Sequence, residues 1–494
     1  MNSTVKISRS KKEQAVVYFL YEDKLKELSL LEKKEQDAVK TVLKTKDFEG
    51  KNGQISLLYV GEKRLFIVGL GKRKECNIRH WKQAVGSVLM QAQKKKITQI
   101  SMLISKIVSS YVDTDLFAQT GTVSAYNALY AFDDFKEKEA KVVAVKSIEW
   151  IVADKRISNL FIKGVKKGKY IAEGVLFTRM LGNTPPTEMT PTLLADHAKD
   201  LEKNKNISVQ ILNKKQIEAK KMGCLLAVSR GSVLEPKFII VEYKGKDSKH
   251  PTVLVGKGIT YDSGGLSLKP DPYMRDMKFD MLGAATVLGI IKAAAKMGLK
   301  KHIIGLIPAC ENMPSGDAYR PDDILTAMNG KTVLIENTDA EGRLILADAL
   351  VYAQTLQPKE VIDFATLTGA CMVALGNERS GLFTPEDDLA DKLDAASKNI
   401  GEMLWRLPVG EEYTTAMKSE IADIKNLGGV GNPRFGGAST AAAFLQFFTQ
   451  NEKGNAYPWA HIDLSSCYYG ESGKAHIRGG ANGFGVETMI QYFS

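Results

Sequence analysis

The chain has 494 residues, of which 44% are hydrophobic and 25% are charged, and its formal net charge at pH 7 is +11. These values are ordinary for a soluble globular protein, and a chain of this length is expected to form two or more domains. Such a chain can bury a large core, so it does not need disulfide or metal staples in order to fold.

The sequence carries no sign of secretion or of membrane insertion. The N-terminus, MNSTVKISRSKKEQ, lacks the apolar core of a signal peptide, and no run of about 18 apolar residues predicts a transmembrane helix. The five cysteines are scattered, and none forms a C-x-x-C pair. Reduced thiols fit this usage better than a disulfide framework, so a cytoplasmic protein is expected.

The positive charge is concentrated in residues 51–100, which hold 11 lysines and arginines against 2 acidic residues. An anionic partner such as nucleic acid is one interpretation of this stretch. A solvated, lysine-rich surface is the favoured one, because the stretch lacks the interleaved aromatic residues of single-strand binders.

Residues 1–160 predict a smaller N-terminal α/β domain, because short apolar strands alternate there with helical patterns. We expect two strands around the polar turn of QISLLYVGEKRLFIVGL, a helix at WKQAVGSVLMQAQKKK and another strand at ITQISMLIS. Residues 161–184 are predicted to connect this domain to the next. The second half of that connection reads as a helix that ends before the double proline.

Residues 185–494 predict a larger catalytic α/β domain in which strands and helices alternate. The strand-like runs are HPTVLVGKGI, HIIGLIPA, KTVLIEN and EVIDFATLT, and the helical ones are GAATVLGIIKAAAKMG, RLILADALVYAQTL and STAAAFLQFFTQN. This alternation predicts a mixed, mainly parallel central sheet covered on both faces. In such folds the chemistry lies in loops beyond the carboxyl ends of the strands.

Charged residues gather in those loops. The carboxylates are Asp262, Asp280, Asp339 and Glu341, and the cations beside them are Lys257, Lys269 and Arg343. Each carboxylate alone is more often a helix cap or a solvated charge. Together, in apolar sequence, they predict a charged site, because buried like charges are costly unless something neutralises them.

Divalent cations are the usual partners of such a cluster. No histidine lies in either charged stretch, and His461, in WAHIDLSS, is interpreted as a satisfied core or rim residue. An oxygen-rich site suits Mn²⁺ or Mg²⁺, and Zn²⁺ also accepts carboxylates. The residues alone do not select among these metals.

Several segments closely resemble the leucyl aminopeptidase family of metallopeptidases, also called cytosol aminopeptidases. They are NTDAEGRL, VGKGITYDSGGLSLKP, MKFDM, ENMPSGDAYRPDDIL, DFATLTGACMVALG, IADIKN and WAHIDL, and the resemblance extends over most of residues 180–490. The resemblance implies an aminopeptidase that releases N-terminal residues from peptides, leucine and other apolar residues among them, by attack of a water that bridges two metals. Asp322 stands where the family usually has glycine, and SSCYYG after HIDL departs from the usual AG.

The resemblance also assigns roles to single residues. Two divalent ions per subunit, Mn²⁺ or Zn²⁺ with Mg²⁺ as a further candidate, would be held by Lys257, Asp262, Asp280, Asp339 and Glu341. Asp262 and Glu341 would bridge the two ions. Lys269 and Arg343 match the family's two catalytic residues: Lys269 would stabilise the oxyanion, and Arg343 would hold a bicarbonate ion that shuttles a proton.

The substrate pocket and the assembly are likewise implied by the resemblance. Met277, Thr366, Leu367 and Gly369 match positions that line the pocket, although core packing is another interpretation of Met277. The family forms homohexamers, so a homohexamer acting on peptides, without a membrane, is expected. Two alternatives stay open: another two-metal hydrolase such as a phosphoesterase, and nucleic-acid binding through the basic N-terminal domain.

Overall fold

The computed structural model describes residues 1–494 except 10–12, 106–112, 153, 247–249, 433–434 and 452. The chain divides into two compact units. The N-terminal unit comprises residues 1–176, 399–401 and 470–479, and the C-terminal unit comprises residues 177–398, 402–469 and 480–494. Within the described residues, no helix is both long and apolar enough to cross a membrane.

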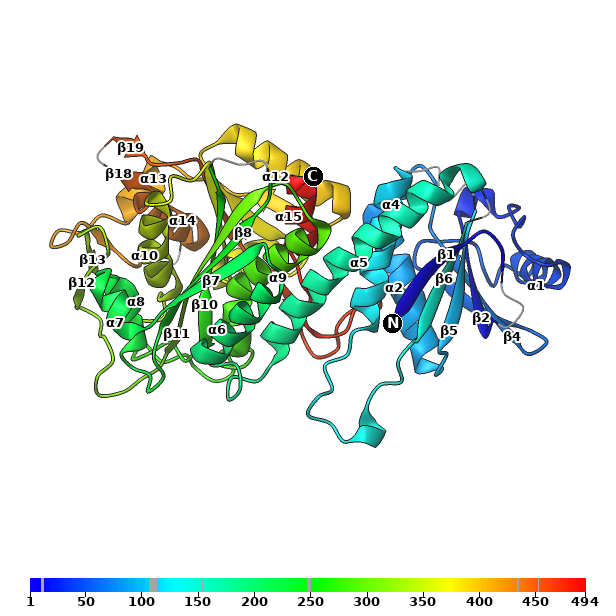
Figure 1. The fold of residues 1–494 in the computed structure, drawn as a ribbon, viewed down its shortest axis with the longest axis horizontal. Coiled ribbons are helices and arrows are strands. Elements are labelled where there is room, and N and C mark those ends of the chain that lie inside the picture. The colour runs from blue at the N-terminus through cyan, green and yellow to red at the C-terminus, as the bar shows by residue number, and fades with distance from the viewer. Residues whose placement is uncertain (10–12, 106–112, 153, 247–249, 433–434, 452) are drawn as a thin grey trace. The chain divides into compact units, whose positions relative to one another are not determined.

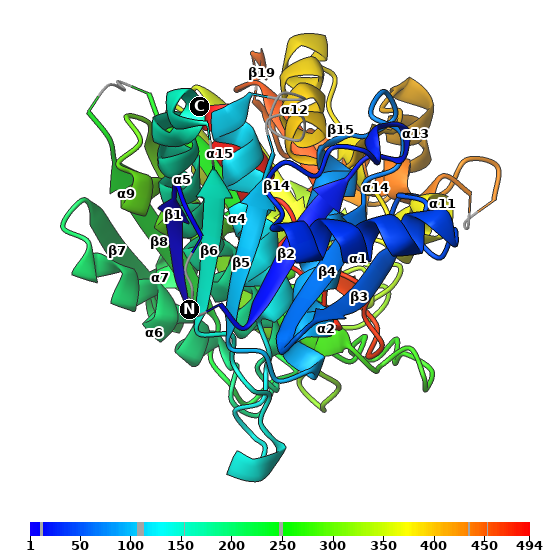
Figure 2. The same cartoon turned by 90° about the vertical axis from the view of Figure 1, so that its right-hand side faces the viewer.

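The N-terminal unit is a six-stranded sheet with the strand order β1-β6-β5-β2-β4-β3 (Figure 2). Neighbouring strands are parallel except for β3 and β4, which form the predicted antiparallel hairpin. The strands are β1 (Asn2–Lys6), β2 (Ala15–Leu20), β3 (Ile55–Val60), β4 (Lys63–Gly69), β5 (Gln99–Ile104) and β6 (Ser147–Val152).

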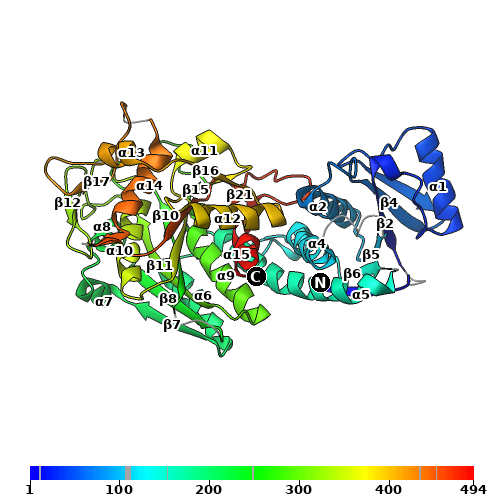
Figure 3. The same ribbon diagram turned by 90° about the horizontal axis from the view of Figure 1, so that it is seen from above.

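Helices cover both faces of this sheet, so the unit has three layers (Figure 3). Strand β2 shows why: Val16, Tyr18 and Leu20 pack in the same cluster as Val39 of α1 (Lys33–Lys44). The alternate residues of β2 belong to a second cluster with α2 (Ile78–Lys94) and α4 (Thr114–Leu129). A strand with apolar side chains on both faces requires a helical layer on each side.

Helix α5 (Lys155–Asn183) occupies the segment predicted to connect the domains. The helix was expected only in the second half of that segment, and it begins earlier. It ends before Pro185 and Pro186, as predicted, because the residue that precedes a proline disfavours the helical conformation.

The C-terminal unit contains a nine-stranded sheet with the order β16-β15-β20-β14-β9-β11-β8-β7, in which β10 also pairs with β11 (Figure 1). The pairings of β8 with β7 and β11, and of β15 with β20, are antiparallel, and the others are parallel. The predicted mixed, mainly parallel sheet is therefore confirmed. The strands are β7 (Ile207–Leu212), β8 (Lys237–Lys244), β9 (Thr252–Gly256), β10 (Gly258–Asp262), β11 (His302–Asn312), β14 (Glu360–Ala365), β15 (Ser380–Phe383), β16 (Leu404–Arg406) and β20 (Trp459–Asp463).

Helices pack on this sheet as the apolar patterns predict. Helix α9 (Leu282–Met297) packs against β9, β11 and β14, while α8 (Gly223–Ser229), α10 (Gly342–Gln354) and α14 (Gly437–Phe447) contribute to one large core cluster with these strands. Helix α9 ends at Gly298, whose φ of 67° is a left-handed conformation that favours glycine. The remaining helices are α6 (Pro191–Lys199), α7 (Lys214–Ala219), α11 (Gly369–Leu375), α12 (Asp387–Ile400), α13 (Glu411–Ala416) and α15 (Val486–Phe493).

The prediction that KTVLIEN joins the central sheet is wrong. Strand β13 (Thr332–Leu334) instead lies in a small sheet between β12 (Ile324–Thr326) and β17 (Ile424–Lys425). Only its central residue, Val333, is fully buried, so this short strand covers the core without being covered on both faces. Nearby, Asp322 adopts a φ of 72°, the left-handed conformation for which the family's usual glycine is suited.

Candidate metal centre

Two charged residues lie at the carboxyl ends of two consecutive strands of the central sheet. Lys257 links β9 to β10, and Asp262 is the last residue of β10. The backbone N–H of Lys257 donates to the carbonyl of Phe364 on β14, and its own carbonyl accepts from Ala284 of α9. Lys257 is thus fixed between two strands and a helix, with its side chain buried.

The other carboxylates come from segments that precede helices. Asp280 lies in a short 3-10 helix, η4 (Met277–Met281), directly before α9. Asp339 and Glu341 lie in the loop that leads into α10. This placement explains why Asp339 and Glu341 stand so close together before α10: one loop brings both carboxylates to the end of the sheet that carries Asp262.

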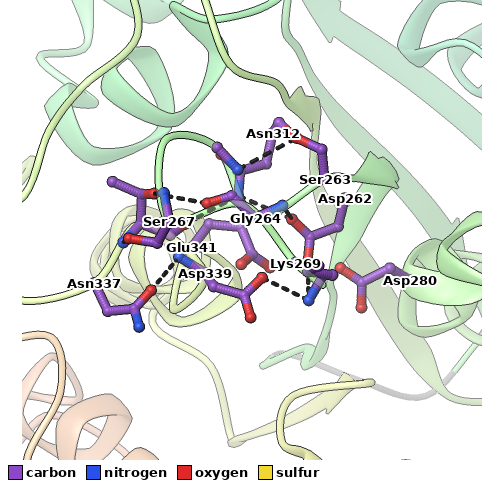
Figure 4. Close-up of polar contacts among 12 residues, drawn as sticks. Asp262, Ser263, Gly264, Ser267, Lys269, Asp280, Asn312, Asn337, Asp339 and Glu341 are labelled. Carbon is purple, nitrogen blue, oxygen red and sulfur yellow. Dashed lines mark hydrogen bonds and ion pairs between the residues drawn. The ribbon is translucent and has the colours of Figure 1, made fainter. Parts of the chain in front are cut away.

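Ion pairs join these residues into one cluster. Lys257 Nζ lies 2.8 Å from Asp280 Oδ2 and 2.8 Å from Glu341 Oε1. Lys269 Nζ lies 2.8 Å from Asp262 Oδ2 and 2.5 Å from Asp339 Oδ1 (Figure 4). Four carboxylates therefore face two lysines.

Three members of the cluster have the arrangement of a cation site. Asp262, Asp280 and Glu341 each offer an oxygen, and these oxygens lie within 4.8 Å of one another. All three side chains are buried, and no described residue donates a hydrogen bond to Glu341 Oε2. A buried carboxylate oxygen without a donor is suited to a metal ion, so the donor set fits a divalent cation.

Crowding and burial shift the pKa values of these groups. Burial, together with Glu341 and Asp262, holds the pKa of Asp280 well above its ordinary value, although Lys257 opposes this shift. Burial and the neighbouring carboxylates raise the pKa of Asp339 to about 7. Burial acts to lower the pKa of Lys257 and of Lys269, but the carboxylates outweigh burial and raise both. The carboxylates thus oppose one another's ionisation, and the two lysines offset this effect only in part.

Arg343 lies beside this cluster, in the first turn of α10, and is buried. One guanidinium nitrogen, Nη1, donates to the carbonyl of Asn426 over 2.8 Å. Burial lowers the pKa of Arg343 to about 10, and Glu341 and Asp463 oppose that shift. Nε of Arg343 has no hydrogen-bond partner among the described residues, so this cation has a donor left to offer.

A cavity of about 830 Å³ opens onto the cluster. Its lining includes ten of the residues predicted from the sequence: Lys257, Asp262, Lys269, Met277, Asp280, Asp339, Glu341, Thr366, Leu367 and Gly369. Met277 therefore faces the cavity and is not purely a core residue. Arg343 is not in this lining.

The segment that carries Thr366 connects the cavity to the cluster. The carbonyl of Thr366 accepts from Lys257 Nζ over 3.0 Å, and its hydroxyl donates to Asp280 Oδ1 over 2.8 Å. Asp463, at the end of β20, accepts from the backbone N–H groups of Leu367 and Thr368. One strand end thus holds the wall of the cavity in place.

Sequence analysis missed Asp463 and three further polar residues that support the site: Asn312, Thr338 and Asn426. Asn312 and Asp463 each end a buried strand of the central sheet. The rule that drew attention to Asp262, a polar residue at the end of an apolar strand, also applies to them. For Thr338 and Asn426 the sequence offers no comparable signal.

His461 lies in the core, which is one of the two predicted placements, but it is not fully satisfied, because its Nε2 is buried without a hydrogen-bond partner among the described residues. Its side chain is completely buried, and Nδ1 lies 2.5 Å from Asp363 Oδ1 on the neighbouring strand. Asp363 also accepts from the indole N–H of Trp459 over 2.7 Å. His461 is outside the lining of the cavity, and no histidine is found among the described residues that line it.

Comparisons with known proteins agree over nearly the whole chain. Residues 176–490 match the catalytic domain of the cytosol aminopeptidase family, and residues 16–139 match the N-terminal domain of that family. A probable cytosol aminopeptidase of Paraburkholderia phymatum is 42% identical over 459 residues, which cover 91% of this chain and 88% of that protein. Its counterpart in Burkholderia multivorans is 42% identical over 462 residues, with 92% and 89% covered.

Solved structures show the same architecture. A tomato leucine aminopeptidase mutant superposes with a TM-score of 0.86 at 31% identity and covers 100% of this chain, with 96% of its own chain matched. The bottromycin maturation enzyme BotP, in complex with Mn, superposes with a TM-score of 0.83 at 29% identity, with 97% and 98% covered. Since both domains and nearly the full length match, the chain belongs to the cytosol aminopeptidase family and is an aminopeptidase, a hydrolase of peptides.

Proposed function

We propose that this protein is a dinuclear metal-dependent aminopeptidase that removes leucine and other apolar residues from the N-termini of peptides. The observation that carries the proposal is the buried set of oxygens from Asp262, Asp280 and Glu341, all within 4.8 Å of one another. The similarity to BotP, whose structure in complex with Mn is known, supports a metal-dependent function.

The residues that would hold the two ions are Lys257, Asp262, Asp280, Asp339 and Glu341. When bound, two divalent ions would lower the pKa of a water molecule and polarise the scissile carbonyl. Mn²⁺ and Zn²⁺ both suit this donor set, and Mg²⁺ is a further candidate. Lys257 would bind as a neutral amine, so a metal must compete with the proton that the carboxylates favour on it.

The chain's own groups would position the substrate and stabilise charge. Lys269 Nζ lies at the cavity edge of the cluster, where an ammonium group can donate to the oxygen that becomes negative during peptide-bond hydrolysis. Arg343 retains an unpartnered N–H donor beside the cluster, which suits a small anion such as bicarbonate.

The preference for an apolar residue rests on the cavity walls. Met277, Leu367, Met372 and Leu464 all contribute apolar surface to the cavity that opens on the cluster. An apolar side chain placed against them would lose contact with water, which favours binding.

Three of the sequence-based expectations stay predictions: the homohexamer, the cytoplasmic location and the domain boundaries at 1–160, 161–184 and 185–494.

A phosphoesterase-like reaction is disfavoured, because the chain belongs to a family of aminopeptidases. Lys94, Lys95 and Lys96 of the basic stretch are exposed at the end of α2, as expected of a solvated surface. Nucleic-acid binding stays an open alternative.

Removal of divalent ions should abolish hydrolysis of a leucine anilide, because the cluster then lacks the charge that activates water. Addition of Mn²⁺ or Zn²⁺ to the chelated protein should restore the activity. The measurement is the initial rate before and after chelation, with metal content determined by elemental analysis. Full activity in a sample shown to be metal-free would refute the proposal.

Substitution of Lys257 should affect metal binding, whereas substitution of Lys269 should affect the rate of hydrolysis. Lys257→Ala should weaken binding of one metal, because it removes a ligand between Asp280 and Glu341. Lys269→Ala should retain both metals and lose about 10²–10³-fold in kcat, the usual loss on removal of one oxyanion donor. Mass spectrometry of the native protein and steady-state kinetics distinguish the two. Loss of a metal in Lys269→Ala, or normal metal affinity in Lys257→Ala, would show that the roles are wrongly assigned.

Gly342 should be required for activity although alanine is the better helix former. A Cβ atom at Gly342 would lie 2.6 Å from Lys257 Nζ, so the buried lysine would have to leave its position between Asp280 and Glu341. Gly342→Ala should therefore lower kcat/KM about tenfold or more through Lys257. Its melting temperature should also fall, because the displaced lysine would lose its ion pairs with Asp280 and Glu341.

The matched control is Gly316→Ala, because a Cβ atom there meets no atom within 4 Å. Kinetics and thermal melting are measured on both variants. An active Gly342→Ala protein would contradict the placement of Lys257 in the metal centre.

A further inference from the structure

Asn312, the last residue of β11, connects the two loops that supply metal ligands. Its side chain is fully buried, and Nδ2 donates to Asp262 Oδ1 over 2.9 Å and to the carbonyl of Thr338 over 3.0 Å (Figure 4). Both acceptors are oxygens. If the amide were flipped, Oδ1 would face these two oxygens and no hydrogen bond could form. The hydrogen-bond network therefore fixes the orientation of the amide.

The backbone of Asn312 holds the same two segments together. Strands β10 and β11 are parallel, and Asp262 stands opposite Asn312 in their register. The carbonyl of Asn312 accepts from the backbone N–H of Ser263 over 3.0 Å and from its hydroxyl over 2.7 Å. Asn312 thus contacts Asp262, the residue after it, and the residue before Asp339.

The hydrogen bonds to Asp262 decide which of its oxygens is free. Oδ1 accepts from Asn312 Nδ2 and also from the backbone N–H of Gly264, each over 2.9 Å. A carboxylate oxygen has about two lone-pair sites, so these two donors occupy Oδ1. Oδ2 is left for the cluster, where it now pairs with Lys269 Nζ.

We propose that Asn312 is a positioning residue of the metal centre: by holding Asp262 Oδ1 and the Thr338 carbonyl, it presents Asp262 Oδ2 to the cations and sets the separation of the two ligand loops. The inference rests on the two-metal function proposed above. The Nδ2 atom of Asn312 cannot bind a metal, because both of its N–H bonds are directed at oxygens. Oδ1 of Asn312 is buried and has no hydrogen-bond partner among the described residues.

The test compares Asn312→Ala and Asn312→Thr with a control asparagine. Threonine keeps nearly the volume of asparagine but lacks the amide. Asn482 is the control, because it is also buried in the C-terminal unit and its amide bonds to the Ser466 carbonyl and the Phe484 N–H, and neither Ser466 nor Phe484 is a proposed ligand. The control variant is Asn482→Ala.

Titration calorimetry with Mn²⁺ and with Zn²⁺ on the full-length, metal-free proteins gives the dissociation constants, and thermal melting reports stability. Both Asn312 variants should bind each metal about 10–100-fold more weakly, as expected when a partner of a metal ligand is removed. The visible spectrum of the Co²⁺-loaded Asn312→Thr protein should also differ from that of the wild type. Asn482→Ala should lose stability and keep normal metal affinity.

Unchanged metal affinity and Co²⁺ spectrum in the folded Asn312 variants would overturn the inference. Failure of both variants to fold, while Asn482→Ala folds, would also overturn it, because Asn312 would then serve the fold and not the ligand. A wild-type protein that binds no divalent ion would instead refute the two-metal function on which the inference depends.

Discussion

Four carboxylates meet two lysines at one buried end of the central sheet, and this imbalance of charge is the constraint on which the catalytic unit depends. Ionised carboxylates that are removed from water repel one another and require cations nearby. Lys257 and Lys269 each pair with two of them, and burial still raises the pKa of Asp339 to about 7. The cluster therefore lowers the stability of the folded chain by itself, and binding of further cations would stabilise the chain.

The fold brings the charges together through the ends of adjacent parallel strands. Strand β10 pairs with β11 in a register that sets Asp262 opposite Asn312, 50 positions later in the chain, and Lys257 lies just before β10. The loop before α10 then approaches from the side, and the Thr338 hydroxyl donates to the carbonyl of Gly264 over 2.6 Å. Gly264 has a φ of 90°, and a Cβ atom there would lie 2.5 Å from the Ser267 carbonyl, so this turn requires glycine. The rigid strands and the hydrogen-bonded loops together keep the carboxylates in place.

Much of this arrangement follows from local sequence. Apolar runs indicate the strands of the central sheet, and NTDAEGRL places two carboxylates at the start of a helix. The supporting contacts do not follow, because they depend on how distant segments are aligned. Asn312 reaches Asp262 only because of the register of β10 and β11, which is irregular between Ile259 and Asp262. Asn426 Oδ1 accepts from the backbone N–H of Glu336, which lies 90 positions earlier in the chain. The prediction for KTVLIEN was wrong for a different reason. Its strand, β13, has only three residues, which is too short a pattern to indicate the sheet to which it belongs.

The central claim is that this cluster holds two divalent ions, and anomalous diffraction from crystals grown with Mn²⁺ tests it most directly. The account predicts two anomalous peaks about 3.5–4 Å apart. Both should lie among Asp262, Asp280, Asp339 and Glu341, with Lys257 Nζ and Asp262 Oδ2 within bonding distance of a peak. A map with no peak at the cluster, or with manganese bound elsewhere in the chain, would contradict it.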